Sequence, residues 1–232
     1  MIIRLAANVV RSGERMALTL EGLTEEQVRE PSGLAGCSRG WVASHVVRSV
    51  EAYQWLLGLA ATGTEPGPRL SGAEIGQAVE AGAGRSGAVL ADELRGRLGE
   101  LAGLAGELSQ ERWEYLVTAL AGWRHPAWYT LYRCWREFET HHADLAAGYG
   151  PADWPEAYVR WALEDTLAAL TAREVQLGVV EATDLGLRWE TGAGPGLAAP
   201  GWSLLARLAG RSAEGPAIEL PAWPLPPAPG WG

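Results

Sequence analysis

The segment 133–145, with the sequence RCWREFETHHADL, constrains the fold of this chain more than any other, because three carboxylates and two imidazoles fall within thirteen residues. If the segment is helical, Glu137 and His141 project from the same face, since residues four apart are neighbours on a helix. Two of the chain's four histidines are adjacent here. A third ligand would come from another segment, and His45 is the obvious candidate. The pattern predicts helices that carry ligands toward one another, as in a helical bundle.

The amino-acid composition excludes several classes of function but says little about the fold. The chain has 232 residues, which is room for one large domain or two small ones. Its net charge of -9 and pI near 5.0 argue against nucleic acid or an anionic membrane surface as a partner. All 19 basic residues are arginines, which excludes a catalytic lysine. Two cysteines make no disulfide framework, and there is no signal-peptide core or long apolar run, so we expect a cytoplasmic chain.

Apolar residues recur at helical spacing in five segments that turn signals separate. We predict helices at 2–21, at 39–59 after Ser38 as N-cap, at 75–108 as one long helix, at 127–147 and at 155–177. Beyond about 183 the pattern predicts strands at 185–192 and 217–225, with a helix at 201–211 that Ser203 opens between them. The predicted fold is therefore mainly α, a four-helix bundle over 1–182 followed by a small α+β C-terminal domain over 183–232.

Three residues on two predicted helices form a candidate metal site, namely His45, Glu137 and His141. Three protein ligands with an open fourth position are typical of catalytic zinc. Each residue also has an ordinary interpretation: the pair four residues apart can be a solvated helix face, and a lone histidine on an apolar face can be a core residue with one hydrogen bond. Glu139 and His142 point elsewhere on the helix, as a solvent-facing pair or as support for the ligands.

Neighbouring residues allow further interpretations. Cys134 could line the same cavity, or it could be a small buried apolar side chain. Asp144 could favour the end of the helix, or it could hold His141 through a hydrogen bond. Ser44, His45 and Asp144 could be combined into a hydrolase triad, but no nucleophile elbow is present, and we set this alternative aside.

Three blocks of sequence resemble the mycothiol-dependent maleylpyruvate isomerase family, a branch of the DinB-like four-helix metalloproteins. The first is SGLAGCSRGWVASHVVRSVEA, in a register that implies His45 as a metal ligand. The second is REFETHHADL followed by GYGPADWP, which implies Glu137 and His141 as the other two. The third is WSLLARLAGRS followed by PAW, which is similar to the family's C-terminal domain and implies Arg211 as its substrate-binding, catalytic arginine.

The resemblance implies a zinc enzyme with mycothiol as its low-molecular-weight thiol cosubstrate. Zinc would hold the thiol as a thiolate, which adds to an electrophilic small molecule so that the molecule is isomerised or S-conjugated. Such an enzyme would work as a monomer or homodimer. The alternative is a non-catalytic member of the same fold, a sensor or accessory protein that binds metal or a hydrophobic ligand.

The chain also departs from the family pattern in the expected substrate pocket. Trp41 and Cys134 replace residues that are usually polar or cationic, and the segment before 75 lacks a tyrosine and an arginine that are often found there. We predict a pocket that includes Trp41, Cys134 and His142, less cationic and more aromatic than usual. A more apolar electrophile than maleylpyruvate is expected to suit it.

Overall fold

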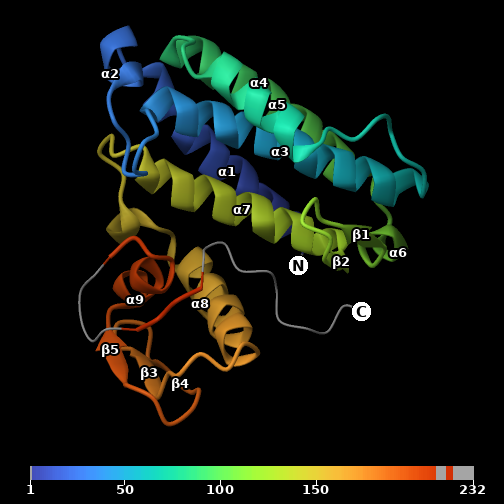
Figure 1. Cartoon of the computed structure of the whole chain (residues 1–232). Coiled ribbons are helices and arrows are strands. Elements are labelled where there is room, and N and C mark those ends of the chain that lie inside the picture. The colour runs from blue at the N-terminus through green and yellow to red at the C-terminus, as the bar shows by residue number, and fades with distance from the viewer. Residues whose placement is uncertain (1, 213–217, 222–232) are drawn as a thin grey trace. The chain divides into compact units, whose positions relative to one another are not determined.

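The computed structural model describes residues 2–212 and 218–221. Contacts divide the chain into two compact units, one that ends at Gly150 and one that begins at Pro151. Within the described residues, the first unit is helical apart from one short hairpin, and the second combines helices with a small sheet (Figure 1). This confirms the predicted mainly α fold with a small α+β part. No helix of the described part is both long and apolar enough to cross a membrane.

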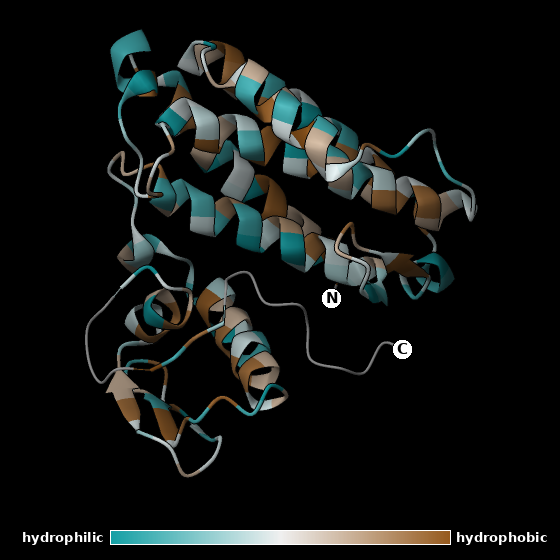
Figure 2. Ribbon diagram, in the orientation of Figure 1, coloured by the Kyte–Doolittle hydropathy of each residue, from teal (hydrophilic) through white to brown (hydrophobic). Residues whose placement is uncertain are grey.

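Four long helices build the first unit: α1 (Ile2–Glu21), α3 (Arg39–Thr62), α5 (Gly87–Glu107) and α7 (Ala127–Asp144). Helices α1 and α3 both contact α5 and α7, so the four close a bundle (Figure 1). Each carries apolar and polar positions in turn along its length (Figure 2). Met16, Leu57, Leu94 and Phe138, one from each helix, are fully buried in the core. Burying an apolar face against neighbours in this way supplies most of the stability of such helices.

Shorter elements connect the long helices: α2 (Glu25–Arg29), α4 (Gly72–Gly82), α6 (Gln110–Trp113), β1 (Leu116–Thr118) and β2 (Arg124–Pro126). The two strands pair antiparallel, with Val117 opposite His125. Helix α4 packs on α3. The hairpin leads directly into α7, so it fixes the position at which that helix begins.

Helix α3 begins and ends where its capping residues dictate. The Ser38 hydroxyl accepts the Trp41 amide at 3.1 Å, which confirms the predicted N-cap. Gly63 ends the helix in the left-handed conformation, at φ 78°, three residues later than predicted. The length of α3 matters because it carries one predicted ligand near its start.

The predicted single helix over 75–108 is wrong, because the structure has two helices, α4 and α5, in its place. The Ser86 hydroxyl caps α5 by accepting the Val89 amide at 3.4 Å. The turn before it passes tightly over α3: a Cβ on Gly40 would lie 2.1 Å from the Ala83 carbonyl oxygen. An N-cap and a close approach of backbones therefore interrupt a continuous helical pattern.

The second unit contains η1 (Pro151–Asp153), α8 (Glu156–Thr171), β3 (Val179–Ala182), β4 (Leu187–Glu190), β5 (Leu197–Ala199) and α9 (Gly201–Leu208). The strand order is β4-β3-β5, with β3 antiparallel to β4 and parallel to β5. Helix α9 packs against α8 and contacts β3 and β5. The unit thus has its own small core between helices and sheet.

Several predictions for the C-terminal part need correction. Three strands precede α9, so the predicted order of strand, helix and strand is wrong. Pro200, not Ser203, is the N-cap of α9, and α8 ends at Thr171. Of the predicted strand 217–225, residues 218–221 carry no strand and the others lie outside the described residues. The compact units divide before α8, because α8 packs on α9; a domain boundary after 182 stays a prediction.

Candidate metal centre

The three predicted ligands come together between α3 and α7. One ligand atom from each of His45, Glu137 and His141 lies within 4.8 Å of the other two. Oε1 of Glu137 is 2.9 Å from Nε2 of His45 and 3.4 Å from Nε2 of His141. The two imidazoles meet edge to face, with ring centroids 4.9 Å apart. Two nitrogens and a carboxylate oxygen therefore converge on one point.

The spacing of these atoms suits a tetrahedral ion. Zinc bonds of about 2.0–2.1 Å to nitrogen and oxygen place tetrahedral ligand atoms about 3.4 Å apart. The two distances from Glu137 Oε1, 2.9 and 3.4 Å, lie close to that value. Three side chains leave one of four positions for another molecule. The residues present thus fit zinc by donor type, number and spacing.

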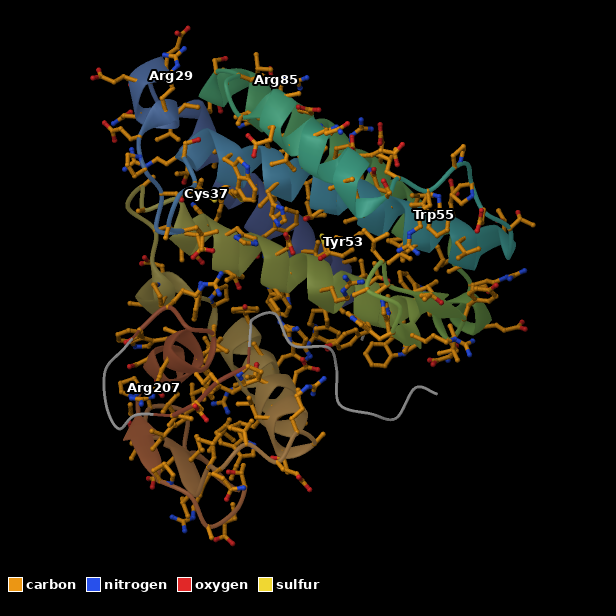
Figure 3. The ribbon with its side chains drawn as sticks, viewed as in Figure 1. Arg29, Cys37, Tyr53, Trp55, Arg85 and Arg207 are labelled. Carbon is orange, nitrogen blue, oxygen red and sulfur yellow. The ribbon has the colours of Figure 1, made fainter. Side chains whose placement is uncertain are left out.

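Two hydroxyl groups on α3 hold the Glu137 carboxylate. Ser49 donates to Oε1 at 2.8 Å and Tyr53 donates to Oε2 at 3.1 Å; Figure 3 shows Tyr53 on this helix. Burial works against the charge of Glu137, but His141, His45 and the Ser49 hydrogen bond outweigh it and bring its pKa well below the usual value. Burial and the neighbouring Glu137 raise the pKa of Tyr53 well above 10, so its hydroxyl stays a donor. The carboxylate is ionised and oriented before any ligand binds.

Asp144 orients the His141 ring. Its Oδ2 lies 2.9 Å from Nδ1 of His141, and the carboxylate is buried. With the proton on Nδ1 donated to Asp144, the Nε2 lone pair is free to face the site. This confirms the hydrogen-bonding interpretation of Asp144. A triad with Ser44 and His45 is not assembled, because Asp144 pairs with His141 and Ser44 packs against Gly82 of α4.

Trp41 lies on the other side of His45. Its indole stacks on the imidazole, with centroids 5.5 Å apart and planes within 3° of parallel. The indole N–H donates to Oε1 of Glu80 on α4 at 2.7 Å, which fixes the ring. Burial lowers the pKa of His45, but Glu137 and Asp144 raise it above its usual value. The structure therefore brings Trp41 to the site, as predicted, although its contact with a substrate stays a prediction.

The other two predicted pocket residues, Cys134 and His142, are both buried. Cys134 is fully buried, and burial followed by the charge of Glu137 raises the pKa of its thiol, which makes it an inert core residue. His142 points to α1, where its Nε2 is 2.8 Å from the Thr19 hydroxyl, and it stacks on Tyr149 at 3.9 Å. The contact of either side chain with a substrate therefore stays a prediction, as it does for Trp41.

Glu139 does not face solvent, which was one of the two interpretations of this residue from the sequence. It is buried and forms an ion pair with Arg15 of α1 at 2.6 Å. Ser12, Trp135 and Tyr149 also donate to its carboxylate. Burial and the bonded Glu139 raise the pKa of Tyr149 far above its usual value, so the phenol remains a donor. This face of α7 is structural and fastens the helix to α1.

Arg133 stands one turn before Glu137 on α7 and adds a cation that the predicted pocket did not include, while the less cationic and more aromatic pocket stays a prediction. Its guanidinium lies 5.0 Å from the Tyr53 ring centroid and 4.6 Å from that of Trp123. No ion pair in the described part of the chain includes Arg133. The signal in the sequence was the i, i+4 relation to Glu137, which applies to arginine as much as to histidine.

His125 of β2 holds Arg133 in place as a neutral ring. Nη1 of Arg133 donates to Nε2 at 3.2 Å, while Nδ1 lies 2.9 Å from the Pro126 carbonyl and donates to it. Burial lowers the pKa of His125 to about 4. The hydrogen bond to Pro126 acts in the opposite direction, and the charge of Arg133 lowers the pKa further. The histidine is therefore neutral near pH 7 and leaves the positive charge of Arg133 undiminished.

Arg211 follows α9 and belongs to the second unit, while the three proposed ligands belong to the first. Its Nη1 donates to the Ala209 carbonyl at 2.7 Å, and its backbone amide donates to Ala206. The side chain is half-buried. Its role toward a substrate stays a prediction.

Comparisons with known proteins agree with this architecture. Residues 9–146 match the sequence model of the mycothiol maleylpyruvate isomerase N-terminal domain. A crystal structure of the mycothiol-dependent maleylpyruvate isomerase covers 96% of this chain and 97% of its own, with 22% identity and a TM-score of 0.83. A structure of a histidine-to-alanine mutant of this isomerase matches over the same shares with 22% identity and a TM-score of 0.79. No curated protein matches the chain.

Proposed function

Because the chain belongs to the family defined by the mycothiol maleylpyruvate isomerase N-terminal domain, we propose that it is a zinc enzyme with a low-molecular-weight thiol cosubstrate. The thiol proposed is mycothiol, and the reaction is isomerisation or S-conjugation of an electrophilic small molecule in the cytoplasm. The observation that carries the proposal is the convergence of His45, Glu137 and His141 within 4.8 Å.

The surrounding residues support a site that is prepared for an ion. When bound, zinc supplies a positive centre that stabilises a thiolate at neutral pH. His45, Glu137 and His141 would hold it. Ser49 and Tyr53 fix the carboxylate, and Asp144 fixes the tautomer of the neighbouring imidazole. Because these hydrogen bonds hold the ligand side chains in place before zinc binds, little conformational entropy is lost on binding.

Arg133 gives an indication of the charge that the substrate carries. Its unneutralised guanidinium, one turn from Glu137, can pair with a carboxylate of the electrophile. Trp41, stacked on His45, offers an aromatic surface on the opposite side. An electrophile with a carboxylate and an apolar portion suits these two groups, and it remains more apolar than the dicarboxylate maleylpyruvate.

The thiol is tested with the cobalt-substituted protein, because Co²⁺ occupies zinc sites and reports sulfur ligation by a charge-transfer absorption band. We expect about one cobalt per chain. Titration with mycothiol should produce the band and saturate at one thiol per metal, while the disulfide of mycothiol, which lacks a free thiol, should produce none. Metal binding without a band would favour the non-catalytic sensor or accessory protein instead.

We propose that Arg211 binds an anionic group of the substrate or thiol, since a guanidinium offers a bidentate fork to a carboxylate. Arg211→Lys keeps the charge but loses the fork, so we expect the KM to rise at least about tenfold with unchanged zinc content. Arg188→Lys, at an exposed arginine of the same unit, is the matched control and should leave the KM unchanged. Equal KM values in the two variants would make Arg211 a surface charge.

A further inference from the structure

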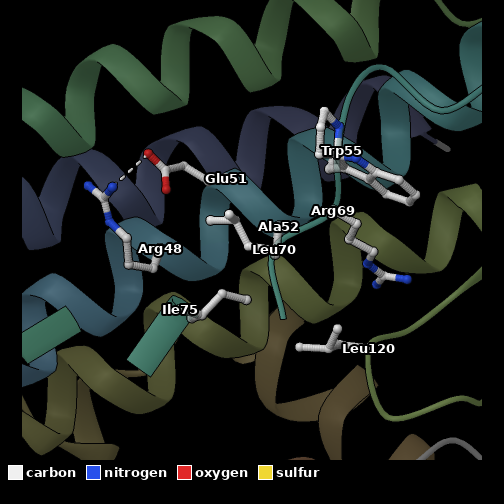
Figure 4. A pocket seen from close by; sticks show the side chains of 9 residues that line it. Arg48, Glu51, Ala52, Trp55, Arg69, Leu70, Ile75 and Leu120 are labelled. Atoms are coloured by element: carbon white, nitrogen blue, oxygen red, sulfur yellow. Dashed lines mark ion pairs between the residues drawn. The ribbon is translucent and has the colours of Figure 1, made fainter. Parts of the chain in front are cut away.

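A hollow of about 190 Å³ opens on the far side of α3 from the helix core. Ala52 and Trp55 of α3 form one side, and Leu70, Ile75 of α4 and Leu120 of the β1–β2 turn form the other (Figure 4). All of these belong to the first compact unit. The lining is mostly hydrocarbon and aromatic, which is usual for sites that bind small organic molecules.

Two of its apolar side chains are unusually exposed. Leu70 is 46% and Leu120 is 49% exposed, and both belong to the few large apolar side chains on the described surface. Side chains that line a concavity and remain in water gain free energy when a ligand covers them, at about 25 cal/mol per Å² of apolar area. The hollow therefore favours an apolar occupant.

The charges at one end of the hollow already neutralise one another. Arg48 forms an ion pair with Glu51 at 2.9 Å, shown in Figure 4, and another with Glu93. Glu51 also pairs with Arg97 at 2.8 Å. This end offers neither a free cation nor a free anion to a ligand.

Arg69 at the other end is a cation without a carboxylate partner among the ion pairs of the described residues. Its Nη1 donates to the Thr118 carbonyl at 2.9 Å, and its guanidinium lies 4.8 Å from the Trp55 ring centroid. Burial, followed by the charge of Arg133, lowers the pKa of Arg69, while Glu65 raises it. An arginine remains protonated despite this, so the open end of the hollow is positively charged.

We propose that this hollow binds a small carboxylate with a single apolar ring, with the ring between Ala52 and Leu120 and the carboxylate at Arg69. A dry cavity of about 150 Å³ accommodates benzene, so about 190 Å³ suits one ring and a substituent. The hollow is lined by none of the three proposed metal ligands and by none of the residues that hold them, and Ala52 follows His45 by seven residues on α3, about 10 Å along the helix axis. The inference goes beyond the proposed enzymatic function.

The proposal is tested by fluorine NMR on the full-length, zinc-loaded protein with 4-fluorobenzoate and 4-fluorobenzamide as probes. These molecules share a shape and differ in charge. We expect the acid to bind at least tenfold more tightly than the amide. Arg69→Gln should remove this preference by weakening the acid alone, and Ala52→Leu, which fills the hollow, should weaken both probes at least tenfold.

Two controls separate this site from others. Arg29→Gln changes an exposed arginine outside the lining and should leave both affinities unchanged. Protein freed of metal should bind the acid as tightly as the zinc-loaded protein does. Absence of binding, equal affinity for acid and amide, or loss of the acid on metal removal with Arg69→Gln unaffected would each overturn the proposal. Arg69→Gln alters a surface side chain, so its result stands even if Ala52→Leu misfolds.

Discussion

The His141→Ala variant is expected to lose its zinc, while the neighbouring His142→Ala variant keeps about one zinc per chain. His141 is one of the three proposed protein ligands, and even the loss of a residue that only orients a ligand typically weakens metal binding by 10–100-fold. The loss of a ligand should therefore weaken it by more than about 100-fold. Zinc content after dialysis against a weak chelator measures the difference, and thiol-dependent turnover should fall in parallel.

His142→Ala is a demanding control because it removes the adjacent imidazole from the same helix. In the structure that ring contacts Thr19 and Tyr149, so its loss should lower stability without changing metal content. Asp144→Asn should fall between the two, since the carboxylate only orients the His141 ring. Equal zinc content in all three variants would remove the site assignment.

Gly87→Ala is expected to destabilise the protein by about 3 kcal/mol, the upper end of the usual cost of overpacking. A Cβ at Gly87 would lie 2.1 Å from the Leu20 carbonyl oxygen and 3.2 Å from that of Leu23. These are backbone atoms at the end of α1 and just after it, and α1 packs along α5, so they cannot rotate aside as a side chain can. Urea denaturation, with the slope held constant, measures the change.

Gly96→Ala provides the matched comparison on the same helix. Its Cβ would meet nothing within 4 Å, and alanine is favoured over glycine in a helix interior by about 1 kcal/mol. We expect this variant to be more stable than the native protein. A similar loss of stability in both variants would show that the approach of α1 to α5 is not as close as described.

Features that depend on nearby residues could be predicted from the sequence. The Ser38 cap, the helix that it starts, and the four-residue spacing of Glu137 and His141 each follow from local rules. The choice of His45 as third ligand followed from the scarcity of histidines and was strengthened by the resemblance, because nothing local relates α3 to α7. The structure then brought the three ligand atoms together.

Features that depend on distant partners could not be predicted. Glu139 is buried against Ser12 and Arg15, which bind its carboxylate and lie more than a hundred residues away in the sequence. His142 is buried in the same way, with its ring at hydrogen-bond distance from the Thr19 hydroxyl. A polar helix face without known partners resembles a solvated one, and only the packing of α1 distinguishes them. The break at Ser86 was missed for a related reason, since a serine inside an apolar repeat becomes a cap only when the chain turns there.

Two faces of helix α7 carry different contacts: Glu137 and His141 lie at the candidate metal centre, and Glu139 and His142 contact α1. A single inserted or deleted residue between 137 and 141 would rotate everything after it by about 100° relative to what comes before. The ligand pair and the attachment to α1 would be lost together, and no substitution could restore either. Length changes in relatives are thus expected to avoid this stretch and to accumulate in the exposed connection at 63–71, where the chain can lengthen without turning a helix.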